Sequence, residues 1–200
     1  METNDIFQQM ARRYDTEDRI KTAKVIANEI RGQLGNTQGK CALDYGCGTG
    51  LIGLALADLF ETMYLIDAAP QMIEQVQKKI EEAHISTAVA LCQDFSAESP
   101  TKLKFDYIFM SQVLLHIRDI FLILRQMFRI LKKDGYLIIV DFDKNEDVIS
   151  DKVHHGFEQR QVIQLAKQIG FTSVNARTFF HGEKLLMNQD ASLFILSAKK

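Results

Sequence analysis

The feature that most constrains this chain is a glycine-rich turn between an apolar run and a helical pattern. The stretch ALDYGCGTGLIGLALA covers residues 42–57 and contains the glycines Gly46, Gly48, Gly50 and Gly53. Glycine permits positive φ and lets the backbone come close to a ligand. The turn is therefore a candidate ligand site, and the alternative is a tight strand-to-helix turn that holds nothing.

Short apolar runs alternate with helical patterns along most of the chain. We expect strands at residues 40–45, 62–67, 87–94, 105–111, 136–142, 173–180 and 192–198. We expect helices at residues 5–14, 17–34, 51–59, 70–83 and 158–169, and one more that runs from the end of the fourth strand to residue 131. A turn is expected at residues 132–135. Strands alternating with helices indicate a parallel sheet covered on both faces. The last two strands lack a helix between them, so we expect an antiparallel pair at one edge.

The strand ends of such a sheet carry the candidate ligand contacts. In an open α/β sheet, ligands bind beyond the carboxyl ends of the strands. This rule places the glycine turn on one rim with four polar side chains that end strands, Asp67, Asp94, Ser111 and Asp141.

Composition limits the possible partners. The 200 residues include 46% hydrophobic and 25% charged residues, which is typical of one soluble domain. A net charge of −2 without a basic tract argues against a nucleic-acid partner. No apolar run approaches the roughly 18 residues of a membrane span, and the first twenty residues lack a signal-peptide core. The three cysteines form no CxxC motif. We therefore expect a cytoplasmic protein with reduced thiols, no membrane partner and no metal.

Charge distinguishes the ligands that the glycine turn could hold. No lysine follows these glycines in the Walker pattern, which argues against a nucleoside triphosphatase. The spacing Gly48-x-Gly50-x-x-Gly53 does match the dinucleotide fingerprint. However, Asp44 precedes Gly46 by two residues, and we expect its carboxylate to face a ligand entering the turn. A carboxylate repels a pyrophosphate but attracts the sulfonium and ammonium of S-adenosylmethionine.

Two further acidic residues fit an adenosine. Asp67 ends the second strand, where a carboxylate can accept hydrogen bonds from both ribose hydroxyls; a helix N-cap is the alternative role. Asp94 ends the third strand, where it or the adjacent backbone could meet the adenine amino group, with Phe95 against the ring. For Asp94 the alternative is an ordinary turn residue.

At this point the sequence resembles the class I S-adenosylmethionine-dependent methyltransferases. The resemblance is carried by LDYGCGTG (43–50), LIDAAPQMIEQ (65–75), CQDFS (92–96), FDYIFMSQVLLHI (105–117) and LKKDGYLIIVDF (131–142). The segments ARRYDTEDRIKTAKVIANEI (11–30), VHHGF (153–157) and EKLLMNQDASLFILSAKK (183–200) look like a small bacterial subgroup of that family. Nearly the whole chain is covered.

The resemblance implies an α/β fold in one methyltransferase domain, residues 1–200. Residues 1–35 would form an N-terminal helical lid, and residues 40–200 a Rossmann-like core. The core would be a seven-stranded sheet of order 3-2-1-4-5-7-6 with strand 7 antiparallel and helices on both faces. The cofactor, S-adenosylmethionine, would yield S-adenosylhomocysteine. The implied cofactor residues are Asp44, Gly46, Cys47, Gly48 and Gly50 for the methionine part, Asp67, Ala68 and Met72 for the ribose and adenosine, Asp94 and Phe95 for the adenine, Ser111 and Gln112 near the sulfonium, and Tyr14 over the cofactor.

Methyl transfer from a sulfonium is an in-line displacement, which an enzyme accelerates mainly by holding donor and acceptor in line. A general base is needed only for a protonated acceptor, and histidine is the usual choice. We predict that His116 or His155 lines the acceptor pocket; the alternative is that they only shape it. His154, His155 and Asp141 together could bind a metal, although adjacent histidines on a strand point in opposite directions.

The acceptor is expected to be a small molecule. The segment MSQVLLH after the fourth strand lacks the Asn/Asp-Pro-Pro-aromatic motif of amino-methylases that act on DNA bases and proteins. Two other functions remain open. One is a non-catalytic protein that binds S-adenosylmethionine or S-adenosylhomocysteine. The other is an NAD(P)-dependent oxidoreductase, which Asp44 and the lack of a Tyr-x-x-x-Lys pair disfavour. The sequence leaves the oligomeric state open.

Overall fold

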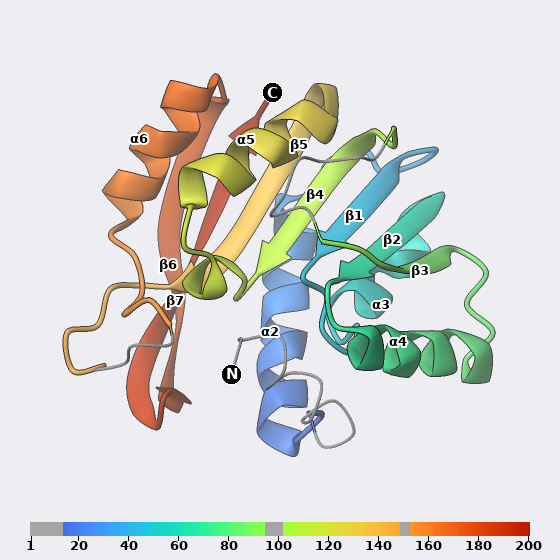
Figure 1. Cartoon of the computed structure of the whole chain (residues 1–200), viewed down its shortest axis with the longest axis horizontal. Coiled ribbons are helices and arrows are strands. Elements are labelled where there is room, and N and C mark those ends of the chain that lie inside the picture. The colour runs from blue at the N-terminus through green and yellow to red at the C-terminus, as the bar shows by residue number, and fades with distance from the viewer. Residues whose placement is uncertain (1–13, 95–101, 149–152) are drawn as a thin grey trace.

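A computed structural model describes residues 14–94, 102–148 and 153–200 and contains one seven-stranded sheet (Figure 1). Its order is β3-β2-β1-β4-β5-β7-β6. Neighbouring strands from β3 to β5 pair in parallel, whereas β7 is antiparallel to both β5 and β6. The predicted strand order and the antiparallel strand 7 are confirmed. The strands are β1 Cys41–Tyr45, β2 Thr62–Asp67, β3 Ala88–Cys92, β4 Phe105–Ser111, β5 Leu131–Phe142, β6 Thr172–Leu186 and β7 Gln189–Lys199.

Helices cover both faces of the sheet. In the view of Figure 1, α2 lies behind the sheet and α5 lies in front of it. The helices are α2 Glu17–Gln33, α3 Gly53–Leu56, α4 Pro70–Glu82, α5 Ile120–Ile130 and α6 Gln159–Ile169, with 3-10 turns η2 Ala57–Leu59 and η3 Leu114–His116. Within the described part of the chain, no helix is long and apolar enough to cross a membrane.

The helix ends follow from local sequence. Thr16 caps α2, because its hydroxyl accepts a hydrogen bond from the amide of Arg19 at 3.4 Å. Pro70 occupies the first turn of α4, where a missing N–H costs nothing. Gly170 ends α6 in the left-handed conformation, with φ of 117°. These three boundaries agree with those expected from the sequence to within a residue.

The core lies between the central strands and the helices on both faces. Phe105 and Phe109 of β4 and Leu43 of β1 are fully buried. Continuous burial is expected for central parallel strands, since both of their faces are covered. The carboxyl ends of β1, β2 and β4 therefore meet at one edge, to which the arrowheads of β2 and β4 point in Figure 1.

The structure corrects three of the expected elements. The turn at 132–135 is a bulge inside β5, because Leu131 already pairs with Phe105 before the regular register resumes at Tyr136. The helix expected over 51–59 divides into α3 and η2. The last two strands, expected at residues 173–180 and 192–198, are longer and form one hairpin. Its turn residues Met187 and Asn188 both have positive φ, as a tight two-residue hairpin turn requires.

The helix expected at 5–14 lies almost entirely outside the described residues. The division of the chain into a lid of residues 1–35 and a core of residues 40–200 stays a prediction.

Candidate functional site

The glycine turn joins β1 to α3 and has a conformation that requires glycine. Gly46, Gly48 and Gly50 have φ of 71°, 54° and 81°, in the left-handed region that disfavours residues with a Cβ. A Cβ atom at Gly46 would also lie 2.5 Å from Cγ2 of Val113. The turn therefore presents bare backbone on the rim.

Asp67, at the end of β2, holds the turn in place. Its Oδ2 accepts a hydrogen bond from the amide of Gly48 at 2.9 Å, and its Oδ1 accepts one from the amide of Ala69 at 2.9 Å. Burial raises the pKa of this carboxyl, the backbone hydrogen bonds oppose the rise, and Asp94 adds to it. Each carboxylate oxygen has a second lone pair that can accept from a ligand hydroxyl.

Asp44 lies beneath the turn, which corrects the expectation that it faces an entering ligand. The residue is 2% exposed, and its Oδ2 accepts a hydrogen bond from the amide of Gly53 at 3.0 Å. The first amides of a helix need acceptors, and Asp44 supplies one to α3. Burial, with a smaller contribution from Asp67, raises the pKa of Asp44 to about 7.

Tyr14 covers the turn from the side of the N-terminus. Its ring packs against Ala69 and Met72 and lies 3.8 Å from the position that a Cβ atom of Gly48 would occupy. The guanidinium of Arg19 lies 4.0 Å from the ring centroid on one side of it, and burial raises the pKa of the Tyr14 hydroxyl. The structure thus brings Tyr14 and Met72 together with the turn, as the predicted site requires.

An ionic network that the sequence analysis missed ties the residue after Tyr14 to the turn. The Thr49 hydroxyl donates to Oδ1 of Asp15 at 2.5 Å. The Lys79 ammonium donates to Oδ2 of Asp15 at 2.6 Å and to the carbonyl of Thr49 at 2.7 Å. The three residues are far apart in sequence, and only the packing of α4 against β2 and β3 brings Lys79 to the turn.

The remaining predicted cofactor residues lie at the ends of β3 and β4. Asp94 is exposed, and Phe95 lies outside the described residues. The Ser111 hydroxyl is buried and has no hydrogen-bond partner among the residues that the structure describes. Gln112 has φ of 54°, and its amide donates to the carbonyl of Val140 at 2.7 Å.

Two more of the predicted cofactor residues, Cys47 and Ala68, lie in the glycine turn and just after β2. Burial raises the pKa of the Cys47 thiol well above its usual range, so the thiol stays protonated. Ala68 follows Asp67 at the end of β2 and is half-buried.

The two candidate histidines lie on neighbouring segments but in different surroundings. His116 ends η3, and burial lowers the pKa of its imidazole to about 4, which keeps it neutral at physiological pH. His155 is exposed. His154 joins their segments, since its amide donates to the carbonyl of Leu115 at 2.9 Å and its Nε2 lies 2.9 Å from the carbonyl of Ile117.

The acidic residues at the end of β5 are engaged in structural contacts. Asp141 is fully buried and accepts from the amides of Leu114 and Phe142, each at 2.9 Å. Its pKa is raised to about 7 by burial. Asp143 accepts from Gln159 and Thr178, each at 2.6 Å. Across residues 14–94, 102–148 and 153–200, no group of three or more His, Cys, Asp or Glu side chains is arranged to hold a metal.

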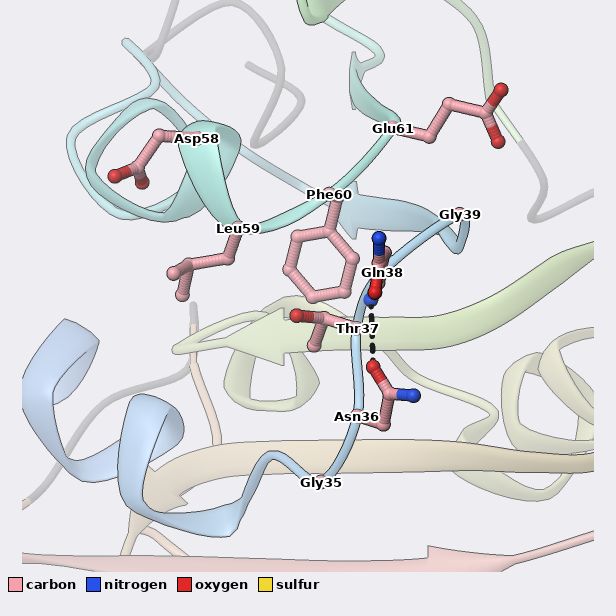
Figure 2. Close-up of a pocket in the computed structure, with 9 residues that line it drawn as sticks. All are labelled: Gly35, Asn36, Thr37, Gln38, Gly39, Asp58, Leu59, Phe60 and Glu61. Atoms are coloured by element: carbon pink, nitrogen blue, oxygen red, sulfur yellow. Dashed lines mark hydrogen bonds between the residues drawn. The ribbon is translucent and has the colours of Figure 1, made fainter.

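A cavity of about 520 Å³ lies at the opposite edge of the sheet. It is lined by residues 35–39, which precede β1, and 58–61, which precede β2 (Figure 2). A neighbouring cavity of about 530 Å³ shares Gly35 and Asn36 with it. Both lie at the amino ends of parallel strands, far from the glycine turn at the carboxyl ends.

Comparison with known proteins gives consistent results. A family model described as a methyltransferase domain matches residues 36–189. An uncharacterised methyltransferase of Schizosaccharomyces pombe is 25% identical over 154 residues, which make up 74% of this chain and 54% of that protein. A ubiquinone biosynthesis O-methyltransferase of Xanthomonas campestris is 31% identical over 103 residues, which make up 50% of this chain and 42% of that protein. The chain thus spans about half the length of these curated relatives.

A solved structure has the same fold. A SAM dependent methyltransferase from Aquifex aeolicus matches with a TM-score of 0.71 at 18% identity, over 96% of this chain and 97% of that one.

Proposed function

Because the chain belongs to the methyltransferase-domain family, we propose that it transfers the methyl group of S-adenosylmethionine to a small-molecule acceptor. The observation that carries the proposal is the position of Asp67. Its carboxylate lies at the end of β2, bonded to the amides of Gly48 and Ala69. An acidic residue at this point of an α/β sheet binds ribose hydroxyls.

The electrostatics of the turn fit a cationic ligand. Burial raises the pKa of both Asp44 and Asp67. The charge of Asp67 raises the pKa of Asp44 further, and both carboxylates raise the pKa of Cys47. A positive charge bound beside the turn would stabilise both carboxylates, whereas the charge of a pyrophosphate would repel them. The bare backbone at Gly46 and Gly48 leaves room for the ligand to approach closely. S-adenosylmethionine, when bound, would supply a methyl group on a positively charged sulfur.

The proposed contacts follow the order of the strand ends. Asp67 accepts from the ribose hydroxyls, and Ala68, Met72 and Tyr14 enclose the adenosine. Asp94 and Phe95 meet the adenine. Asp44 acts through the backbone of the turn, in which Gly46, Cys47, Gly48 and Gly50 surround the methionine part. Ser111, whose hydroxyl has no partner within the described structure, and Gln112 lie toward the sulfur.

Positioning accounts for most of the catalysis in this proposal. Holding the acceptor in line with the methyl group can contribute on the order of 7–11 kcal/mol. His116 is neutral and can accept a hydrogen bond from a protonated acceptor or a proton from it, although a pKa of about 4 makes it a weak base. His155 is the second candidate for this role.

A small acceptor is supported by two observations. One of the curated relatives is named as a ubiquinone biosynthesis O-methyltransferase. The net charge of −2 gives no electrostatic support to a nucleic-acid substrate. We also propose that the protein acts in the cytoplasm, without a membrane partner.

Calorimetric titration with S-adenosylmethionine, S-adenosylhomocysteine and NAD tests the cofactor. We expect micromolar binding of the first two, weakened at least tenfold in Asp67→Asn and unchanged in Asp58→Asn, whose carboxylate lines the cavity at the opposite edge of the sheet. Binding of NAD alone would contradict the proposal. Transfer of labelled methyl groups to a panel of phenols, amines and thiols then separates an enzyme from a protein that only binds the cofactor.

A further inference from the structure

Lys79 joins two parts of the chain that the cofactor would lie between. Its ammonium donates one hydrogen bond to Oδ2 of Asp15 and one to the carbonyl of Thr49. Asp15 directly follows Tyr14, and Thr49 lies inside the glycine turn between Gly48 and Gly50. A single side chain of α4 therefore fastens the Tyr14 segment to the turn.

The surroundings make this contact more than an exposed ion pair. The side chains of Lys79 and Asp15 are 30% and 28% exposed, and Thr49 is 2% exposed. The Thr49 hydroxyl closes the network by donating to the other oxygen of Asp15. Partly buried, charge-assisted bonds of this kind are stronger than ion pairs on the open surface.

The network lies next to one aromatic ring, that of Tyr14, the residue before Asp15. Tyr14 packs against Ala69 and Met72 and over Gly48, where the adenosine and methionine parts of the cofactor are proposed to bind. Arg19 also contacts Tyr14. Its guanidinium donates a hydrogen bond of 3.1 Å to the carbonyl of Tyr14 and lies against the ring. If the bond from Lys79 to Asp15 is lost, the charged contact on this side disappears, and the bond from Thr49 to Asp15 and the contacts of Arg19 remain.

We propose that Lys79 is a positioning residue that sets how long the cofactor stays bound, by fastening Tyr14 across the glycine turn. The inference rests on the proposed function, since it takes S-adenosylmethionine as the ligand. Lys79 contacts neither the reacting atoms nor the methyl group. Its loss should speed cofactor release more than it slows binding, because a Tyr14 side chain that is no longer fastened is a smaller barrier to escape.

Release of labelled S-adenosylhomocysteine into an excess of unlabelled ligand tests the proposal. We expect Lys79→Met to raise the dissociation rate about tenfold, the factor that one charge-assisted hydrogen bond is worth. Lys79→Arg should restore most of the wild-type rate, because it keeps the charge and the donors. The matched control is Lys78→Met, which removes the adjacent lysine, 67% exposed and paired on the helix surface with Glu82.

Two further variants keep the test decisive. Asp15→Asn removes the charge that Lys79 binds and should raise the dissociation rate in the same direction if Lys79→Met does not fold. Tyr14→Trp places one tryptophan in a chain that has none, so its fluorescence should report a more exposed ring when Lys79→Met is added.

The possible failures are distinguishable. Variants that fold and bind but release the ligand at the wild-type rate would overturn the role of Lys79 and leave the proposed function intact. A wild-type protein that binds neither S-adenosylmethionine nor S-adenosylhomocysteine would overturn both.

Discussion

The amide of Gly48 lies 2.9 Å from Oδ2 of Asp67, and this bond links the glycine turn after β1 to the end of β2. The other oxygen of Asp67 accepts from Ala69, just before α4. One carboxylate thus aligns two loops at the rim and keeps a lone pair on each oxygen for a ligand.

Gly46→Ala should destabilise the protein strongly. A Cβ atom at this position would lie 2.5 Å from Cγ2 of Val113, and φ is 71°. Adding Val113→Ala should recover the steric part and leave about 1–2 kcal/mol for the left-handed backbone. Gly32→Ala is the matched control, because a Cβ there meets nothing within 4 Å and alanine favours the helix by about 0.5–1 kcal/mol. Urea unfolding of wild type, Gly46→Ala, the double variant and Gly32→Ala measures these changes in the free energy of unfolding. A Gly46→Ala protein as stable as wild type would contradict the described turn.

Stability should depend on pH through Asp44. Its pKa in the folded protein is about 7, above the 3.8 of an unperturbed aspartate. The folded state therefore binds a proton more tightly than the unfolded state, and the free energy of unfolding should fall as pH rises from about 4 to about 7. Asp44→Asn keeps an oxygen for the amide of Gly53 and should reduce this dependence, leaving the part that comes from Asp141, whose pKa is also raised to about 7. Urea unfolding at a series of pH values checks it, with Asp58→Asn as a control; parallel curves for wild type and Asp44→Asn would be inconsistent with a raised pKa.

Cofactor affinity should rise with pH over the same range. A bound cation favours the charged form of Asp44 and so lowers its pKa, which means that binding near or below about pH 7 releases a proton. Calorimetry in buffers of different ionisation enthalpy measures that proton. The Asp44→Asn protein should bind the cofactor more weakly than wild type at high pH, and it should release no proton from residue 44 on binding. Proton uptake on binding would have the wrong sign for this account.

His116 should remain neutral through the working pH range. Since burial lowers the pKa of its imidazole to about 4, a plot of turnover against pH should show no inflection from His116 above about pH 5. Once an acceptor is known, comparing wild type with His116→Asn measures this directly. An inflection near pH 6.5 that disappears in His116→Asn would show that the imidazole is more accessible than its burial implies.

The order of the strands could be predicted because the strand ends carry the residues by which the sequence resembles a known family, and that resemblance implies the order. The glycine turn, Asp67 and Gly170 each have a local signature that fixes a turn or a helix boundary. The position of Asp44 could not be predicted in the same way. Whether a carboxylate at a strand end faces the rim or the helix below depends on which unpaired amide it meets, and that amide belongs to Gly53.

The Lys79 network was unpredictable for a different reason. It joins positions 15, 49 and 79, which share no spacing and become neighbours only when α4 packs on the sheet. The bulge in β5 was missed because it appears only in the pairing of β5 with β4, in which Leu131 pairs with Phe105 and Tyr136 with Tyr107.

The measurement that tests the central claim most directly is a crystal structure of the protein with S-adenosylhomocysteine. We predict that both ribose hydroxyls lie within hydrogen-bonding distance of the Asp67 carboxylate, about 2.5–3.0 Å, with the ring of Tyr14 over the ligand. An adenosine bound elsewhere, such as in the cavity formed by residues 35–39 and 58–61, would contradict the assignment of the glycine turn as the cofactor site.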